Sequence, residues 1–324
     1  MCSSDLLHWR PYTFRLPSAL VSAQGRWLDR RGWLLRLEAP DGRLAWGEVP
    51  DLPAAWRTPE PERPPLAEVL AQLPGELERS WLEAQLPALP GALACGLGMA
   101  LADLDGLAWL EAPASAELLP AGKAGLPALE TLRKQAGDQP RCVKWKVAVD
   151  ADTEERALLE RLLEQLPPDW GLRLDANGGW DRPVAEGWAD RLACEPRLQW
   201  LEQPLEPTDL EGLQALAQRL PVALDESLRQ CPECVDADWP GWRVHRPLAE
   251  ADPRPLLEQL QRGVPRLMVS TAFETGIGRR FVHHLAGLQA LGPTPVAPGF
   301  APAWQPEGPL FSVDPQAVWE AAAP

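Results

Sequence analysis

The chain has 324 residues, 45% of them hydrophobic, and a formal net charge of −15. This length is typical of about two domains, and the acidic balance argues against nucleic-acid binding, which needs a positive surface. No apolar run reaches the roughly 18 residues of a membrane span, and the first residues lack the basic and apolar regions of a signal peptide. We therefore expect a cytoplasmic monomer or homo-oligomer without nucleic-acid or membrane partners.

Residues 1–110 combine strand-like and helical patterns. Two apolar runs, 33–39 and 44–49, flank Pro40-Asp41-Gly42-Arg43, and Asp-Gly between such runs predicts a β-hairpin. A proline-rich linker covers about 50–65, and helical patterns follow over 66–73 and 91–110. The segment 1–110 therefore predicts an α+β domain. The proline-rich tail, 300–324, is expected to pack back on it.

From about residue 118 onward, short apolar strands alternate with amphipathic helices. The predicted strands are 117–121, 141–149, 171–176, 198–202, 222–225, 242–246, 266–270 and 294–297; the predicted helices are 126–136, 153–165, 183–193, 207–219, 252–262 and 277–290. This alternation is typical of a parallel sheet covered by helices, and its length favours a closed barrel over residues 111–299.

The cysteines do not predict a disulfide framework, because six in a chain of this length are too sparse. Cys231 and Cys234 form a CxxC motif without a second pair or a nearby histidine. A surface loop or short helix is therefore favoured there over a zinc or redox site.

Four of the 31 basic residues are lysines, and two of these, Lys144 and Lys146, lie two positions apart in an apolar strand. Arginine keeps its proton in proteins, whereas lysine can lose it once burial or a nearby cation lowers its pKa. Alternate strand residues share a face, so both lysines should point into the barrel while Val143 and Trp145 face the helices. The pair predicts base chemistry. The alternative is two exposed lysines on an edge strand.

Three acids, Asp175, Glu202 and Asp225, stand at the ends of three successive predicted strands. In a barrel, these ends meet at one rim. Converging carboxylates need a cation, and a hard divalent ion with oxygen ligands suits them, Mg²⁺ by default and Mn²⁺ as an option. The alternative is that each acid caps the helix that follows. Arg173 and Asn177 share the face of Asp175 and are candidate substrate ligands.

The sixth and seventh predicted strands end in Arg246 and in Ser270-Thr271. Arg246 is in phase with Trp242 and Val244, so it should face inward. Hydroxyls and free backbone N–H groups at the end of the seventh strand can hold an anion, although a plain turn and helix cap would use the same residues. We expect a small carboxylate substrate among these groups.

The motifs Lys-x-Lys, Asp-x-Asn, Glu-Gln-Pro and Asp-Glu-Ser, in this order and spacing, resemble the muconate lactonising subgroup of the enolase superfamily. The segments 173–177 and 270–278 are similar to motifs of the o-succinylbenzoate synthase family. The resemblance covers nearly the whole chain. It implies a modified (β/α)7β TIM-type barrel with an α+β capping domain. It also implies that Lys146 is the catalytic lysine, that Lys144 is its electrostatic neighbour, and that the metal ligands are Asp175, Glu202 and Asp225.

One position departs from the pattern: Arg246 precedes Pro247 where the family usually has lysine. Arginine is a poor base, which disfavours two-base racemisation, whereas syn-dehydration needs one base and a fixed cation can still stabilise an enediolate. The resemblance implies dehydration of 2-succinyl-6-hydroxy-2,4-cyclohexadiene-1-carboxylate to 2-succinylbenzoate, in menaquinone or phylloquinone biosynthesis. The alternatives are an N-acylamino acid racemase, a dipeptide epimerase, a cycloisomerase, and an inactive barrel that acts as a binding protein.

Overall fold

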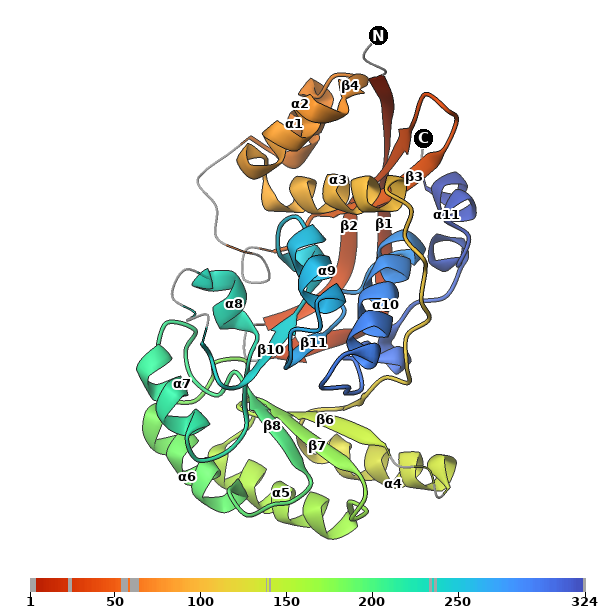
Figure 1. Cartoon of the computed structure of the whole chain (residues 1–324). Coiled ribbons are helices and arrows are strands. Elements are labelled where there is room, and N and C mark those ends of the chain that lie inside the picture. The colour runs from red at the N-terminus through yellow and green to blue at the C-terminus, as the bar shows by residue number, and fades with distance from the viewer. Residues whose placement is uncertain are drawn as a thin grey trace.

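The computed structural model describes residues 4–22, 25–53, 58, 64–137, 139, 141–232, 235 and 238–322. Its strands form a four-stranded antiparallel sheet and a seven-stranded parallel sheet. The antiparallel sheet and the helices beside it lie at one end of the molecule, and the curved parallel sheet with its outer helices lies at the other (Figure 1). In this described part of the chain, no helix is both long and apolar enough to cross a membrane.

The antiparallel sheet has the order β3-β2-β1-β4, from strands β1 (Ser4–Ser22), β2 (Gly25–Glu38), β3 (Leu44–Pro50) and β4 (Glu76–Glu78). β2 and β3 form the predicted hairpin, and Gly42 in its turn has a φ of 83°. The helices of this part are α1 (Leu66–Gln72), α2 (Arg79–Gln85) and α3 (Gly91–Leu104). The predicted helix 91–110 is too long, because Gly106 adopts a φ of 87°, which ends the helical path.

The parallel sheet runs in chain order, from β5 (Glu117–Leu119) through β6 (Cys142–Lys146), β7 (Gly171–Asp175), β8 (Leu198–Glu202), β9 (Val222–Leu224) and β10 (Trp242–His245) to β11 (Leu267–Val269). The helices that alternate with these strands are α4 (Gly125–Ala136), α5 (Asp152–Gln165), α6 (Arg182–Leu192), α7 (Leu210–Ala217), α8 (Glu226–Gln230), α9 (Arg254–Gln261) and α10 (Gly276–Leu291). The predicted βα alternation is therefore confirmed. Helix α8 was not predicted, because its five residues are too few to show a helical repeat of apolar positions in the sequence. Cys234 of the CxxC motif lies outside the described residues.

The predicted eighth strand, 294–297, is wrong. Its place is taken by a single bridge between Ser270 and Gly299. The Thr271 N–H donates to Gly299 O at 3.0 Å on the β11 side, and the Ala116 N–H, just before β5, donates to Pro298 O at 2.9 Å. The extended Pro298-Gly299 segment thus joins the two edges of the parallel sheet. Four of the residues 292–298 are Gly or Pro, which weaken a regular strand.

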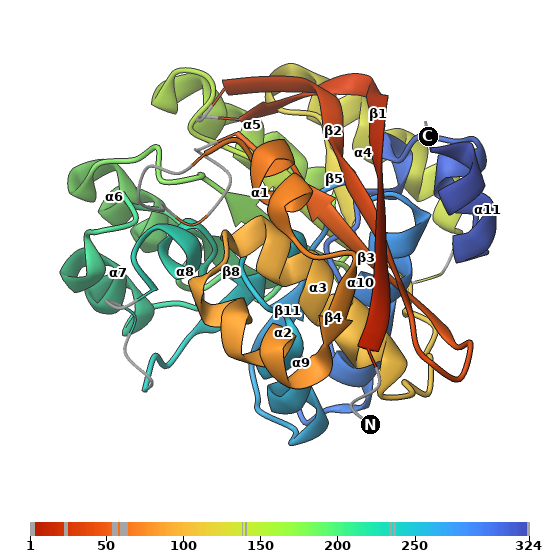
Figure 2. The same cartoon turned by 90° about the horizontal axis from the view of Figure 1, so that it is seen from above.

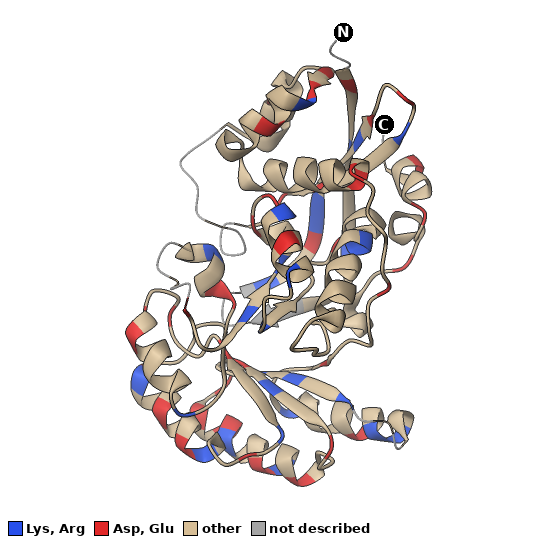
Figure 3. Cartoon of the chain, viewed as in Figure 1, with Lys and Arg blue, Asp and Glu red and all other residues tan. Residues whose placement is uncertain are grey.

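Alternate residues of β6 face the covering helices, as the sequence predicts. Val143 and Trp145 pack with Leu129 of α4 and Leu158 of α5 in one buried apolar cluster. Outside this layer, residues of both charge signs are spread along α5 and α6 (Figure 3). Each barrel strand therefore presents one face to the covering helices and the opposite face to the barrel interior.

The C-terminal tail contacts the antiparallel sheet through α11 (Pro315–Ala321). The Trp319 ring lies 5.8 Å from that of Trp46, and Arg10 Nη1 donates to Trp319 O at 2.9 Å. Five 3₁₀ turns connect other elements of the described chain: η2 (Leu86–Ala88), η3 (Gly122–Ala124), η5 (Pro247–Ala249), η6 (Pro302–Trp304) and η7 (Pro309–Phe311). Seen from above, β1 to β3 and α3 lie in front of the barrel strands (Figure 2). The division into 1–110 and 111–299 stays a prediction.

Candidate active site

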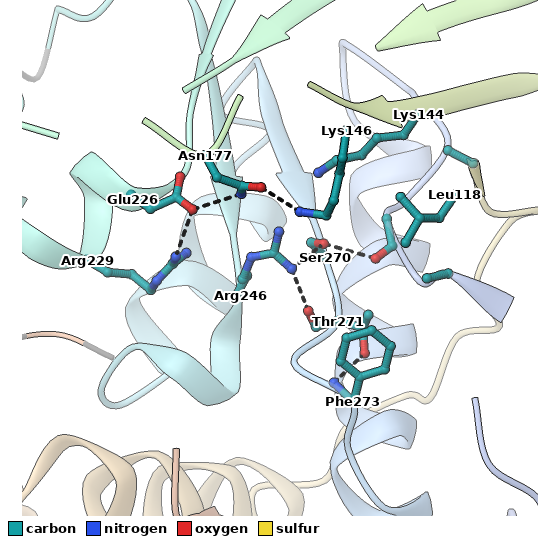
Figure 4. Close-up of a pocket in the computed structure, with 13 residues that line it drawn as sticks. Leu118, Lys144, Lys146, Asn177, Glu226, Arg229, Arg246, Ser270, Thr271 and Phe273 are labelled. Atoms are coloured by element: carbon teal, nitrogen blue, oxygen red, sulfur yellow. Dashed lines mark hydrogen bonds and ion pairs between the residues drawn. The ribbon is translucent and has the colours of Figure 1, made fainter. Parts of the chain in front are cut away.

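The carboxyl ends of the parallel strands meet at a cavity (Figure 4). Polar and charged side chains from five strand ends face apolar ones across it. The residues that line it are Ala116, Leu118, Lys144, Lys146, Asn177, Glu226, Arg229, Arg246, Ser270, Thr271, Phe273, Gly299 and Ala301. Six of the ten residues predicted for the site are among them, so the strand-phase argument located this cavity from sequence.

Lys144 and Lys146 point into the barrel, as predicted, and each is 8% exposed. Lys144 Nζ lies 2.5 Å from Glu202 Oε1 and 2.7 Å from Asp175 Oδ2. Lys146 Nζ donates to Asn177 Oδ1 at 2.6 Å and lies 3.3 Å from Asp175 Oδ2. The predicted lowering of the Lys144 pKa is wrong here. Burial does lower this pKa, but the charges of Asp175 and Glu202 outweigh burial and raise it above its usual value.

The three predicted acids come together and are fully buried. Asp175 lies opposite Glu202 in the register of β7 and β8, and Glu202 lies opposite Ala223, two residues before Asp225. Burial alone would raise the pKa of Asp175, but the two lysines lower it to about 2. Burial likewise opposes ionisation of Asp225, yet Arg229 and Arg246 hold its pKa well below the usual range. The Glu202 pKa is raised, mainly by burial.

Arg246 faces inward, as predicted, and its guanidinium is held on two sides. Nη2 and Nε donate to Asp225 Oδ2 at 2.7 and 3.0 Å. Nη1 donates to Ser270 Oγ at 3.1 Å and to Thr271 O at 2.7 Å. The same Nη2 lies 3.7 Å from Glu202 Oε1. Arg246 therefore ties the end of β9 to the end of β11 as a fixed cation.

The carboxylates fit a hard divalent ion in their chemistry, because three buried oxygen donors from neighbouring strand ends need positive charge. Two cations now supply that charge. Lys144 bridges Asp175 and Glu202, and Arg246 bridges Glu202 and Asp225. In the described part of the chain, no three His, Cys, Asp or Glu side chains are gathered closely enough to hold a metal in this arrangement. Metal binding would therefore require Lys144 and Arg246 to move away from the carboxylates that they now bridge.

Two residues of the cavity were missed from the sequence, Glu226 and Arg229. Glu226 Oε1 accepts from Asn177 Nδ2 at 3.0 Å, which links it through Asn177 to Lys146. Burial, followed by the charge of Asp225, raises the Glu226 pKa to about 7. Signals existed for both residues, since Glu226 lies inside the Asp-Glu-Ser motif and Arg229 follows Asp225 by one helical turn.

The predicted substrate ligands divide into two groups. Ser270, Thr271 and Asn177 line the cavity, whereas Arg173 does not. Arg173 is fully buried in the barrel, where its guanidinium lies 4.0 Å from the centre of the Trp200 ring and its Nε donates to Gln199 Oε1 at 2.7 Å. The alternation of residues along the strand placed Arg173 correctly on the inward face. It could not tell how far from the cavity the side chain lies.

Comparisons with known proteins agree with this architecture. A family model described as "Enolase C-terminal domain-like" matches residues 127–237. The o-succinylbenzoate synthase of Thermosynechococcus vestitus is 37% identical over 288 residues, which are 86% of this chain and 87% of that protein. The o-succinylbenzoate synthase of Edwardsiella ictaluri is 32% identical over 71% of this chain and 69% of that protein.

Solved structures give the same result. The o-succinylbenzoate synthase from Thermosynechococcus elongatus BP-1, complexed with magnesium in the active site, matches with a TM-score of 0.79 and 33% identity over 98% of this chain and 99% of that one. The L-Ala-D/L-Glu epimerase from Bacillus subtilis matches with a TM-score of 0.71 and 20% identity over 93% of this chain and 90% of that one. This second likeness shows the fold alone. The chain therefore belongs to the o-succinylbenzoate synthase family of the enolase superfamily, a family of enzymes.

Proposed function

We propose that this chain converts 2-succinyl-6-hydroxy-2,4-cyclohexadiene-1-carboxylate to 2-succinylbenzoate and water by metal-dependent syn-dehydration. The observation that carries the proposal is the buried pair Lys144 and Lys146 on the cavity wall, beside three carboxylates, in a chain of this family. We place the reaction in menaquinone or phylloquinone biosynthesis and the protein in the cytoplasm.

Lys146 is the proposed base. In its neutral form, Nζ takes the proton from the ring carbon that bears the carboxylate, and the C–H electron pair becomes part of an enediolate. The same ammonium then gives its proton to the hydroxyl on the same face. The C–O bond breaks, water leaves, and the ring becomes aromatic. Asn177, 2.6 Å from Nζ, holds the amine in place between the two proton transfers.

Asp175, Glu202 and Asp225 are the proposed ligands of a divalent ion, Mg²⁺ or Mn²⁺. When bound, such an ion stabilises the negative charge that develops on the substrate carboxylate. Lys144, which bridges Asp175 and Glu202, adds positive charge next to Lys146. Mg²⁺ is the first choice because all three ligands are carboxylates.

Arg246 is the proposed fixed cation on the opposite side of the substrate. Its guanidinium protons are engaged by Asp225, Ser270 and Thr271, and an arginine does not give up a proton at working pH. It can stabilise enediolate charge but cannot serve as a second base, which favours dehydration over epimerisation. Ser270 and Thr271, together with Asn177, are proposed to contact the substrate. Arg173, which contacts Gln199 and Trp200 and does not line the cavity, is not proposed to touch the substrate.

The experiment is an ultraviolet assay that follows formation of the aromatic product, with N-succinylamino acid racemisation and dipeptide epimerisation measured beside it by NMR in deuterated water. We expect dehydration that stops on chelation and returns with Mg²⁺, and no α-proton exchange of the opposite enantiomer. Efficient racemisation without dehydration would contradict the one-base mechanism and favour an epimerase. Absence of both activities and of Mg²⁺ binding would favour a binding protein.

A further inference from the structure

Part of the apolar wall of the cavity is formed by a loop that contacts the antiparallel sheet β3-β2-β1-β4, called the capping sheet below. This loop, Thr271–Thr275, connects β11 to α10 and places Phe273 on the cavity. Phe273 has a φ of 63°, a left-handed conformation that is uncommon for a bulky residue and persists only where the surroundings impose it. The contacts that impose this conformation should therefore determine where the wall stands.

The loop fixes its own N–H groups. The Phe273 N–H donates to Thr271 Oγ1 at 2.8 Å, and the Ala272 N–H donates to Glu274 Oε1 at 2.5 Å. Thr271 Oγ1 donates in turn to Glu274 Oε2 at 2.6 Å. These bonds orient the donors of the loop and leave the carbonyls of Ala272 and Phe273 pointing toward the capping sheet.

Arg30 of β2 meets those two carbonyls. Its Nη2 donates to Ala272 O at 2.6 Å, and its Nε donates to Phe273 O at 3.4 Å. Arg30 is only 5% exposed, so these bonds are formed away from water. A guanidinium presents its donors in a rigid plane and can hold two neighbouring carbonyls at once. The two peptide groups on either side of the Phe273 φ and ψ angles are thus fixed from the capping sheet.

A second capping residue fixes the far end of the loop. Glu48 of β3 is fully buried and accepts from the N–H groups of Thr275 and Gly278 at 3.0 and 3.1 Å. A side chain at position 278 would come within 2.6 Å of Glu48 Oε2, so glycine is required for this approach. The start of α10 is therefore docked on the sheet, and Arg30 acts on a segment whose end is already held.

The Phe273 ring completes the contact between the capping sheet and the barrel. It belongs to an apolar cluster with Leu16 and Ala301, against which Leu28 of β2 and Leu118 of β5 pack. Leu118 also lines the cavity. A shift of the Phe273 backbone would therefore change both this cluster and the cavity wall.

We propose that Arg30 is a positioning residue for the substrate: by holding the Ala272 and Phe273 carbonyls, it keeps Phe273 in its left-handed conformation and sets the wall against which the substrate ring packs. Arg30 does not line the cavity and acts through Phe273. The expected effect of Arg30 on the KM of dehydration rests on the proposed function. The expected effect of Arg30 on the conformation of the loop does not depend on that function.

The first test is hydrogen exchange of the peptide 271–278 in the full chain. Arg30→Met removes both donors and should speed amide exchange in this peptide at least about tenfold, the change produced by about 1.4 kcal/mol. Arg30→Lys keeps the charge and one donor and should give a smaller rise. The matched control is Arg31→Met, because Arg31 lies on the same strand with its side chain 76% exposed and paired to Asp51. Unchanged exchange in a folded Arg30→Met would overturn the proposal. If Arg30→Met does not fold, Arg30→Lys decides in the same way.

The second test is steady-state dehydration. Arg30→Met should raise KM at least about tenfold while kcat changes less than about threefold, the pattern of lost binding rather than lost chemistry. In a Phe273→Ala background the same substitution should leave KM unchanged, because the residue that it positions is gone. Additive effects of the two substitutions would overturn the proposal. A chain that fails to dehydrate the substrate yet shows the exchange result would refute the proposed function and leave the positioning role intact.

Discussion

Replacing Glu48 tests how strongly the capping sheet holds the barrel. Its carboxylate accepts from four donors: the Tyr12 hydroxyl at 2.7 Å, the Thr275 N–H at 3.0 Å, the Thr275 hydroxyl at 2.6 Å and the Gly278 N–H at 3.1 Å. Three of these donors meet the same oxygen, Oε2. Glu48→Ala removes every acceptor, whereas Glu48→Gln can keep its carbonyl at the Oε2 position.

The expected cost follows from what each variant leaves unpaired. In Glu48→Ala the two hydroxyls can turn to other partners, but the two backbone N–H groups cannot, and a buried unpaired donor costs about 1–3 kcal/mol. We therefore expect a loss of about 4 kcal/mol in the free energy of unfolding. In Glu48→Gln the amide NH₂ takes the Oε1 position, where the Tyr12 hydroxyl can turn and accept. The Thr275 N–H loses its 3.2 Å contact there but keeps its 3.0 Å bond to the other oxygen, so we expect a loss below about 1.5 kcal/mol.

The assay is equilibrium urea denaturation of the full chain, followed by circular dichroism. Glu76→Ala is the control, because Glu76 is an exposed strand residue of the same sheet. It should change the free energy of unfolding by less than about 0.5 kcal/mol. A Glu48→Ala variant within about 1 kcal/mol of the wild type would refute the argument, since the N–H groups of α10 would then have found other acceptors.

Four further predictions concern the active site and pH. Asp225→Asn should abolish dehydration and calorimetric Mg²⁺ binding, and a chelator-stripped sample that kept full activity would exclude a metal-assisted reaction. Lys146→Arg keeps the charge but not the transferable proton and should lower kcat at least about 10²-fold; Lys134→Arg, an exposed lysine, should not, and near wild-type rates for Lys146→Arg would refute the one-base mechanism. Arg246→Lys should retain substantial activity and Arg246→Met much less, measured in the same assay; equal rates would exclude a charge role. Burial raises the folded pKa of Glu48 above its usual 4.5, so the stabilisation from its protonated form is complete below pH 4.5 and disappears as pH rises through the folded pKa. Relative to Glu48→Gln, the wild type should therefore lose free energy of unfolding over that pH range in paired urea titrations. A pH-independent difference between the two proteins would contradict the burial argument.

The sequence predicted the barrel because its strands and helices are short, regular and strongly patterned. Lys144 and Lys146 were placed correctly by the period of two alone. The same period could not place the eighth strand, since Pro298-Gly299 joins the sheet edges by a few backbone hydrogen bonds and one isolated bridge rather than by a patterned strand. Helix α8 was missed for a related reason, as five residues do not complete a helical repeat.

The electrostatics of the site were harder to predict than its location. The lysine pair suggested a lowered pKa, but Lys144 bonds to carboxylates from two other strands, and the structure gives it a raised pKa instead. The contacts of Arg30 could not be predicted from the sequence either, because its partners are backbone carbonyls 242 and 243 residues away in the chain. Sequence periodicity gives the direction of a side chain within its own element, while these effects depend on which distant elements meet.

The bond between Ala116 and Pro298 also bears on how the chain is made. Synthesis is vectorial, and this bond joins residues on either side of the parallel strand series, so the edge of β5 stays uncovered until Pro298 has been made. Trp319, which packs on Trp46, arrives later still. Until then the nascent chain exposes an unpaired strand edge and an apolar sheet face, the features that promote aggregation. Truncation of the segment that carries Trp319 should therefore reduce soluble yield more than activity per folded molecule.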